Sequence, residues 1–78
     1  MDIKEALIKI EIELSDATKK YGRFSSTHEA LGVIREEYLE LEKEIFKNPT
    51  QYDWEKMKHE VIQLGAMAVR FLVDFYSS

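Results

Sequence analysis

Residues 61–76 read VIQLGAMAVRFLVDFY, and only Gln63, Arg70 and Asp74 among them are strongly polar. In a helix this stretch places apolar side chains on nearly every side, which is typical of a helix that is buried over most of its surface. The apolar spacing extends back along the chain to Trp54. The sequence therefore predicts a long, largely buried helix in the last third of the chain.

The start of this helix has two candidate positions. Asn48 followed by Pro49 is an N-cap with a proline at the first helical position, and Asp53 is a second N-cap candidate. A helix over residues 50–77 would be about 40 Å long, whereas a compact chain of this size has a radius of gyration of about 11–12 Å. One copy of the chain cannot cover such a helix, so we expect a homodimer or homotetramer.

A second helix is predicted between loops at residues 21–26 and 47–50. Ser26 and Glu29 have the spacing of a capping box, in which each side chain accepts a hydrogen bond from the other residue's backbone N–H. Apolar residues follow at steps of three and four: Leu31, Ile34, Tyr38, Leu41 and Ile45. This spacing predicts a helix with one apolar face.

Residues 3–20 are compatible with two structures. Isoleucines and a leucine alternate with charged residues over residues 8–14, as in a half-buried strand. A helix is favoured because the window also has apolar residues at helical spacing, because Gly22 stands where a C-cap belongs, and because no second alternating run could pair with a strand. We therefore predict an all-α fold, a three-helix unit that completes a four-helix-type bundle by oligomerisation. Gly65 in the third helix permits a close helix crossing or a bend, or is a plain helix glycine.

The composition limits the class of protein. With 78 residues the chain is a single domain over residues 1–78. The net charge of −4 excludes a basic nucleic-acid binder as the first hypothesis, and the absence of cysteine excludes disulfides and thiolate metal sites. The chain has neither a signal-peptide pattern nor the run of about 18 apolar residues that crosses a bilayer. We expect a cytoplasmic protein that has neither a nucleic-acid polymer nor a membrane as a partner.

Three glutamates stand out by their positions. Glu37 and Glu40 flank the edge of the apolar face of the second helix, one turn apart. Glu60 lies on an apolar arc of the third helix, where an unpaired buried carboxylate is strongly unfavourable. If the three converge, they repel one another unless a metal ion neutralises them. Mg²⁺ suits such a site because it takes oxygen ligands and shares its shell with substrate phosphates, and Mn²⁺ is an alternative.

Two simpler interpretations of these glutamates remain open. The second helix is rich in glutamate throughout, which is typical of a solvated face with weak Glu–Lys pairs. Glu60 could also form a salt bridge with Arg35 instead of binding a metal ion.

Two short motifs carry a family resemblance. Residues 36–40 read EEYLE and match an EExxE signature, and residues 60–63 read EVIQ where an ExxD signature stands on the following helix. In these motifs, and over about residues 19–75, the chain resembles the MazG-like all-α nucleoside triphosphate pyrophosphohydrolases. EExxE alone is common in Glu-rich helices, and its pairing with a second acidic position at this separation is more specific.

The resemblance implies an activity and a ligand set. The family hydrolyses an NTP or dNTP between the α and β phosphates, which yields a monophosphate and pyrophosphate. For this chain it implies Glu37, Glu40 and Glu60 as Mg²⁺ ligands, with Glu36 assisting, and Glu37 and Glu40 as the catalytic carboxylates. Gln63 stands at the position of the family's aspartate, and an amide oxygen there is a weaker metal ligand, so activity would be weakened or lost.

Substrate contacts are predicted less specifically. Lys20, Arg23 and His28, around the first loop, are candidate phosphate contacts and equally candidate solvated residues. Trp54 could stack on a base, although core packing is the simpler interpretation. The alternative function is a non-catalytic all-α homo-oligomeric or regulatory module whose acidic residues bind no metal.

Overall fold

The computed structural model of the chain describes residues 1–76 and confirms the all-α prediction for them. Its elements are α1 (Ile3–Tyr21), α2 (Thr27–Ile45), a short 3-10 turn η1 (Pro49–Gln51) and α3 (Trp54–Tyr76). Residues 3–20 are thus helical, as favoured over a strand. Residue 77, where the third helix was expected to end, lies outside the described residues.

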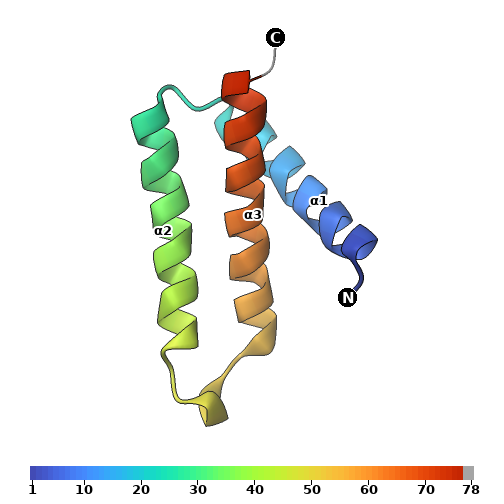
Figure 1. Ribbon diagram of the computed structural model, residues 1–78, viewed down its shortest axis with the longest axis vertical. Coiled ribbons are helices and arrows are strands. Elements are labelled where there is room, and N and C mark those ends of the chain that lie inside the picture. Colours follow the sequence, from blue (N-terminus) through green and yellow to red (C-terminus); the bar gives the residue numbers. More distant parts are fainter. Residues whose placement is uncertain (77–78) are drawn as a thin grey trace.

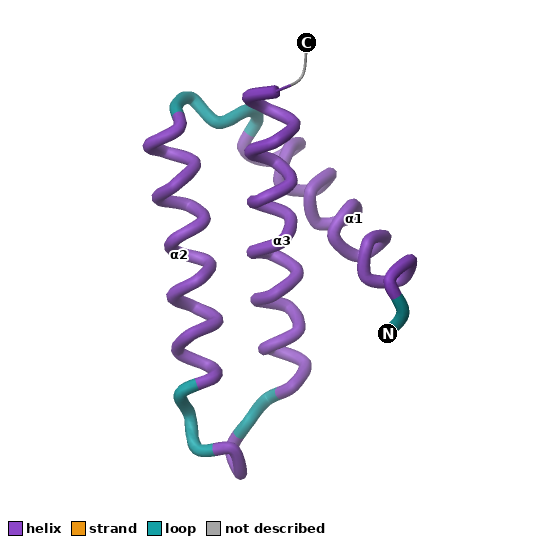
Figure 2. Tube along the Cα trace, in the orientation of Figure 1, coloured by secondary structure: helices purple, strands orange, loops and turns teal. Residues whose placement is uncertain are grey.

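Helix α3 is the central element. Helices α2 and α3 run antiparallel side by side, and α1 packs against α3 at an angle, so that α3 contacts both of the other helices (Figure 1). The two connections lie at opposite ends of the α2–α3 pair (Figure 2). The radius of gyration is 13.5 Å and the principal extents are 46 × 28 × 19 Å. The single chain is therefore more extended than a compact domain of this length, which has a radius of gyration of about 11–12 Å.

The predicted helix caps are present, with one change of partner. The Ser26 hydroxyl accepts a hydrogen bond from the Glu29 N–H at 3.0 Å, which is half of a capping box. The Glu29 carboxylate turns instead to Ser25, whose N–H donates at 3.3 Å and whose hydroxyl donates at 2.5 Å. The Ser25 hydroxyl is the main reason that the pKa of Glu29 is lowered. At α3, Asp53 is the cap, since its carboxylate accepts from the Lys56 N–H at 3.0 Å, while Asn48 caps η1.

Apolar burial in the single chain is small. Among the described residues the buried hydrophobic positions are Ala17, Phe24, Ala30, Ala66 and Met67. Residues of all three helices pack around this core while remaining half-buried: Ile10, Leu14, Val33, Ile34, Phe71 and Phe75. No large side chain within residues 1–76 is fully buried. A core of this size leaves little hydrophobic stabilisation for one copy of the chain.

Helix α2 is turned about its axis relative to the prediction. Ala30, Glu37 and Glu44 repeat every seven residues, and Ala30 and Glu44 are buried while Glu37 is half-buried. The residues that follow them, Leu31, Tyr38 and Ile45, were expected in the core and are 63%, 53% and 43% exposed. The face of α2 that meets α3 is therefore the edge that carries glutamates, and half of the apolar stripe points to solvent.

A buried arginine fastens the first loop to α3. Arg70 donates from Nη2 to the Gly22 carbonyl at 2.6 Å, and its guanidinium lies 3.8 Å from the centre of the Phe24 ring. Asp74, one turn later, accepts from the Phe24 N–H at 2.9 Å. Gly22 has φ +70°, a left-handed conformation that favours glycine, and it ends α1 by donating to the Thr18 carbonyl. The loop is thus held by side chains of α3.

A charge cluster ties the other end of α2 to α3. Glu44 is 3% exposed and accepts a hydrogen bond from Lys47 Nζ at 2.9 Å, and Lys56 Nζ of α3 lies 3.5 Å from its second oxygen. The Lys47 hydrogen bond, with the charges of both lysines, lowers the pKa of Glu44. The carboxylate therefore stabilises the fold in its ionised form.

This cluster predicts a pH dependence of stability. Because the pKa of Glu44 is lowered on folding, its contribution is present above the unfolded value of about 4.3 and is lost as the pH falls through the folded value. Thermal melts should show that Glu44→Gln melts below the wild type at neutral pH and that this difference shrinks at acidic pH. Glu42→Gln, on the same helix, is the control and should melt close to the wild type. A difference that persists unchanged into acid would contradict this role of Glu44.

The two helix-interior glycines should respond differently to alanine. A Cβ at Gly32 would meet no atom within 4 Å, whereas one at Gly65 would lie 3.1 Å from Cδ1 of Ile10 on α1, which confirms the close-crossing interpretation of Gly65. Gly32→Ala should therefore add about 1 kcal/mol to the free energy of unfolding through helix propensity. Gly65→Ala should add less, because Ile10 must shift. Denaturant unfolding at one protein concentration measures both, and equal gains would argue against tight packing at the crossing.

Candidate functional site

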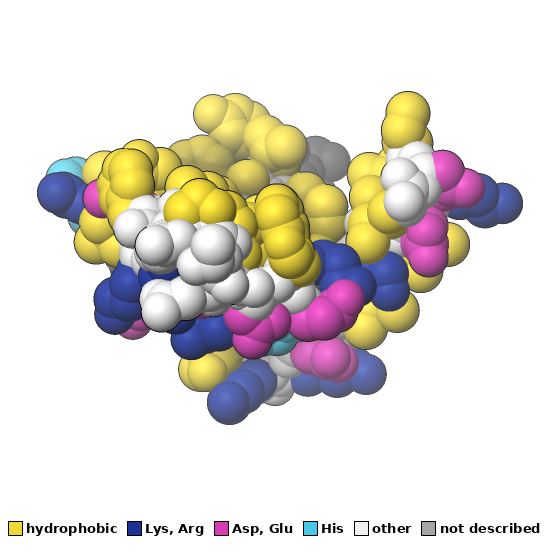
Figure 3. All heavy atoms as spheres, turned by 90° about the horizontal axis from the view of Figure 1, so that it is seen from below, with side chains coloured by type: hydrophobic (Ala, Val, Ile, Leu, Met, Phe, Trp, Pro, Cys, Tyr) yellow, Lys and Arg dark blue, Asp and Glu magenta, His cyan; other side chains and the backbone are white. Residues whose placement is uncertain are grey.

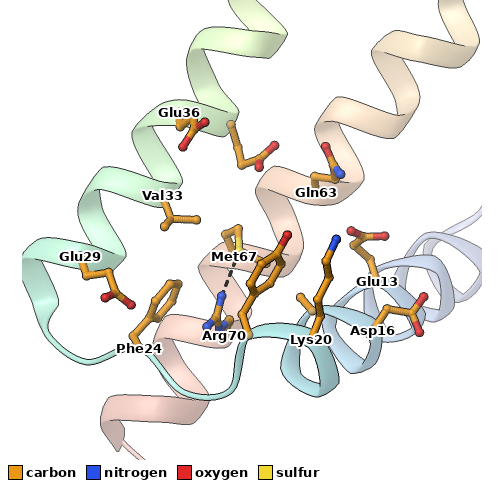
Figure 4. A pocket seen from close by; sticks show the side chains of 13 residues that line it. Glu13, Asp16, Lys20, Phe24, Glu29, Val33, Glu36, Gln63, Met67 and Arg70 are labelled. Atoms are coloured by element: carbon orange, nitrogen blue, oxygen red, sulfur yellow. Dashed lines mark hydrogen bonds between the residues drawn. The ribbon is translucent and has the colours of Figure 1, made fainter.

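An open cavity of about 690 Å³ is formed where the three helices and the first loop meet (Figure 4). Its wall includes Glu13, Asp16 and Lys20 of α1, Glu29, Glu36 and Glu37 of α2, and Gln63, Met67 and Arg70 of α3. The volume lies within the range of about 300–1,000 Å³ that is usual for small-molecule sites. The cavity is therefore the leading candidate for a ligand site in this chain.

Burial and the neighbouring carboxylates raise the pKa of Glu37. Burial is the main reason that the pKa of Glu37 is raised, and the charge of Glu60 on α3 is the next. Glu36, Glu40 and Glu13 contribute in the same direction, the last from α1. Four of these five glutamates were expected at a metal site, and the structure brings them close enough to interact. Repulsion by these glutamates therefore destabilises the ionised form of Glu37.

Glu60 is the most buried of the predicted metal ligands. Its side chain belongs to a residue that is only 7% exposed, and residues 1–76 supply neither a salt bridge nor a hydrogen bond to it. Arg35, the alternative partner considered for Glu60, is exposed on α2 and forms no ion pair with it. The carboxylate oxygens of Glu60 nevertheless remain accessible to solvent, and neither Glu40 nor Glu60 is among the residues that line the cavity.

The acidic side chains are neighbours without converging on one point. In the described part of the chain, no group of three or more His, Asp or Glu side chains is arranged to hold a metal ion as it stands. Gln63 lines the same cavity from α3, three residues after Glu60. Binding of a cation by these residues would therefore require changes of their side-chain rotamers.

Two cationic side chains also line the cavity, together with the carboxylates of Asp16 and Glu29. Arg70 lines it with a side chain that is 5% exposed, and its Nε has no hydrogen-bond partner although Asp74 Oδ2 lies 3.7 Å away. Lys20 extends from α1 into the same space (Figure 4). A cavity lined by both carboxylates and cations has the side-chain types that contact a metal–phosphate ligand.

The predicted substrate contacts are dispersed. Lys20 lines the cavity, but Arg23 pairs with Asp74 on α3, and His28 is exposed on α2. Trp54 lies at the start of α3, in edge-to-face contact with Tyr52, and borders a separate apolar groove between α1 and α3. The structure thus brings one of the four predicted substrate contacts to the cavity.

Sequence reasoning missed the contributions of Glu13, Asp16 and Arg70. Glu13 and Asp16 stand beside the apolar positions Leu14 and Ala17 of α1, so the signal was an acidic pair next to the core stripe. Arg70 was visible as one of the few polar residues in the most apolar helix, where a charged side chain is unusual.

Comparison of the chain with protein-family models, with curated proteins and with solved structures gives no match. The resemblance to MazG-like enzymes therefore depends on the two short motifs. Within residues 1–76, moreover, none of the helices combines the length and apolar character that crossing a bilayer requires.

The acidic end predicts a stability gain from losing a charge. Glu37→Gln should raise the melting temperature in EDTA, because it removes a desolvated carboxylate that faces Glu60 and other glutamates. The gain should disappear as the pH falls through the raised pKa of Glu37, since the wild-type side chain is then neutral too. Glu42→Gln is the control and should change the melting temperature less. A lower melting temperature for Glu37→Gln would indicate an ion-paired, structural carboxylate instead.

Proposed function

We propose that the chain is a Mg²⁺-dependent nucleotide pyrophosphohydrolase of the MazG-like type, with Mn²⁺ as an alternative cofactor, acting in the cytoplasm. It would convert a (d)NTP and water into a (d)NMP and pyrophosphate. The observation that carries the proposal is Glu37, which lines the cavity and whose pKa is raised by burial and by the charge of Glu60 on the neighbouring helix. The EExxE motif at residues 36–40 supports it.

The donor set fits a hard divalent cation. Glu36, Glu37, Glu40 and Glu60 offer carboxylate oxygens, and Gln63 offers an amide oxygen, which are the ligand types that Mg²⁺ and Mn²⁺ accept. Partial burial of Glu37 and Glu60 favours cation binding, because the cation would relieve the repulsion between them. When bound, the metal would polarise phosphoryl oxygens and offset the charge that develops on them.

The cationic and acidic side chains of the chain would have different roles in the reaction. Lys20 and Arg70, which line the cavity, would bind the non-bridging oxygens of the triphosphate. Glu37 has a raised pKa and is therefore the best proton acceptor for an attacking water. The water oxygen bonds to phosphorus, the bridging P–O bond between the α and β phosphates breaks, and pyrophosphate leaves. Glu40, one turn from Glu37, would orient the same water or the cation.

A non-catalytic all-α oligomeric module is the second candidate. The observation that favours it is that the acidic side chains do not converge in the described structure. Gln63 supports the same alternative, because it replaces a charged oxygen ligand by a neutral one. Such a module would neither bind Mg²⁺ at the cavity nor respond to EDTA.

Pyrophosphate release from a panel of NTPs and dNTPs with Mg²⁺ or Mn²⁺ tests the proposal. Wild-type turnover should fall by at least about a hundredfold in Glu37→Gln and in Glu60→Gln, because each loses a charged ligand. Glu42→Gln is the matched control on α2 and should retain turnover. Gln63→Asp should lower the Mg²⁺ concentration that half-saturates the enzyme.

Two results would reject a catalytic role. If neither the wild type nor Gln63→Asp releases pyrophosphate, and Mg²⁺ does not raise the melting temperature, the non-catalytic module is favoured. Turnover that survives in both Glu37→Gln and Glu60→Gln would place any hydrolysis outside this cavity.

A further inference from the structure

Helix α1 is held to the rest of the molecule more weakly than α2. Side chains of α3 bind the first loop and the end of α2 through hydrogen bonds and salt bridges. Within residues 1–76, no such interaction joins a residue of α1 to α2 or to α3. Only Ala17 is buried within α1. Apolar packing against α3 and the connection at Gly22 therefore keep α1 in place.

The fixed end of α1 is its C-terminal end. The first loop is fastened to α3, because Arg70 donates to the Gly22 carbonyl at 2.6 Å and Asp74 accepts from the Phe24 N–H at 2.9 Å. Toward its N-terminus α1 diverges from the hairpin, and in Figure 3, viewed from the η1 end, its first turns project at the side of the molecule. Gly22, with φ +70°, joins the fastened loop to the helix. A small change in its dihedral angles would swing the whole of α1.

Helix α1 has space on both sides of the point where it crosses α3. At the crossing, Ile10 lies against Gly65, which has no side chain to interlock with it. On one side is the candidate site, and on the other is an apolar groove of about 320 Å³, bordered by Ala6 of α1 and Met57 of α3. Side chains fill neither space, so a swing of α1 across α3 would not disrupt a close-packed core.

Carboxylates face one another across the cavity. Glu13 and Asp16 of α1 line it together with Glu36 and Glu37 of α2, and Figure 4 shows Glu13 and Glu36 on opposite sides. The charge of Glu13 is one of the causes that raise the pKa of Glu37, so carboxylates of the two helices interact. These like charges oppose a closer approach of α1 to α2.

A buried cationic side chain in the wall of the cavity is a second, independent indication of a ligand. Arg70 is 4% exposed, and its Nε has no hydrogen-bond partner. Lys20 of α1 lines the same cavity, and within residues 1–76 it forms no salt bridge. Carboxylates bind a cation, and unpartnered donors bind an anion. Because α1 contributes Glu13 and Lys20, its distance from α2 determines how closely such a ligand is contacted.

We propose that α1 is a lid hinged at Gly22, and that a divalent cation shared by Glu13 of α1 and Glu37 of α2 closes it over the cavity. Glu13 lies about 13 Å along the helix from the hinge, so a swing of about 15° would move it by about 3.5 Å. The described conformation is then the open one, since within residues 1–76 no three acidic side chains are arranged to hold a metal ion. The inference rests on the cation binding of the proposed function and not on its hydrolysis. It adds Glu13, which lies outside both motifs, to the ligand set.

The distance between α1 and α2 in solution tests the lid. The chain has no cysteine, so Ser15→Cys and Gly32→Cys together place one spin label on each helix. Ser15 is exposed, and a Cβ at Gly32 would meet no atom within 4 Å. Pulsed electron spin resonance in an excess of unlabelled chain measures distances within one copy. Relative to EDTA, Mg²⁺ should shorten the mean distance by about 2–3 Å and narrow its distribution.

A matched pair of variants on α1 tests the role of Glu13. Glu13→Gln and Glu11→Gln remove the same charge, but Glu11 is exposed and does not line the cavity. Glu13→Gln should abolish the shortening and raise about tenfold the Mg²⁺ concentration at which the rise in melting temperature is half-maximal. Glu11→Gln should match the wild type in both measurements. Both variants should fold, because neither glutamate forms a salt bridge within residues 1–76.

The outcomes separate the lid from the hydrolase. A shortening by Mg²⁺ that is lost in Glu13→Gln and kept in Glu11→Gln supports the lid, whether or not pyrophosphate is released. If Mg²⁺ raises the melting temperature without changing the distance, the lid is overturned and the hydrolase proposal stands. A shortening that survives in Glu13→Gln, or is lost in Glu11→Gln, also overturns the lid. If Mg²⁺ changes neither the melting temperature nor the distance, both proposals fail.

Discussion

The rotation of α2 about its own axis is the constraint on which the rest of the structure depends. Ala30 is completely buried, and its single methyl group lets α2 approach α3 closely. Glu37 and Glu44 follow at seven-residue intervals, so both are drawn toward α3 by the same rotation. The apolar residues beside them are turned outward. The rotation of α2 therefore explains both the glutamates at its contact with α3 and the apolar residues on its outer side.

Glu37 and Glu44 share this face of α2 and have opposite electrostatic surroundings. Glu44 meets Lys47 and Lys56, which lower its pKa, and it fastens α2 to the start of α3. Glu37 meets Glu60, and its pKa is raised. Glu44 therefore stabilises the fold in its ionised form, whereas the ionised form of Glu37 is destabilised by repulsion that a cation would relieve. A neutral residue at position 37 would remove this repulsion, so the stability of the single chain does not explain the carboxylate.

Local features of the fold could be predicted from the sequence, and features that depend on tertiary packing could not. The Ser26 cap, the Asp53 alternative and the helical reading of residues 3–20 rest on interactions within a few residues, and these predictions are confirmed. The rotation of α2 was not predicted, because its stripe from Leu31 to Ile45 favours burial without indicating whether α3 or another chain provides it. The cavity was not predicted either, because it depends on how the three helices and the first loop pack together. Helical positions placed Glu37 and Glu60 near apolar faces without showing that they would meet. The contacts of Arg70 depend on the path of the first loop, which the sequence does not specify.

The small core contains buried charged side chains as well as apolar ones. Among the described residues the buried polar side chains are Glu44, Glu60 and Arg70, beside only a handful of buried hydrophobic ones. Glu44 has two lysines, so its burial is compensated within the chain. Arg70 is compensated in part, since the Gly22 carbonyl, the Phe24 ring and Asp74 hold its guanidinium in place while its Nε stays unpaired. Glu60 has no counter-charge at all in this part of the chain. A guanidinium that is held in advance on one wall of a cavity would lose little side-chain entropy if an anion bound there.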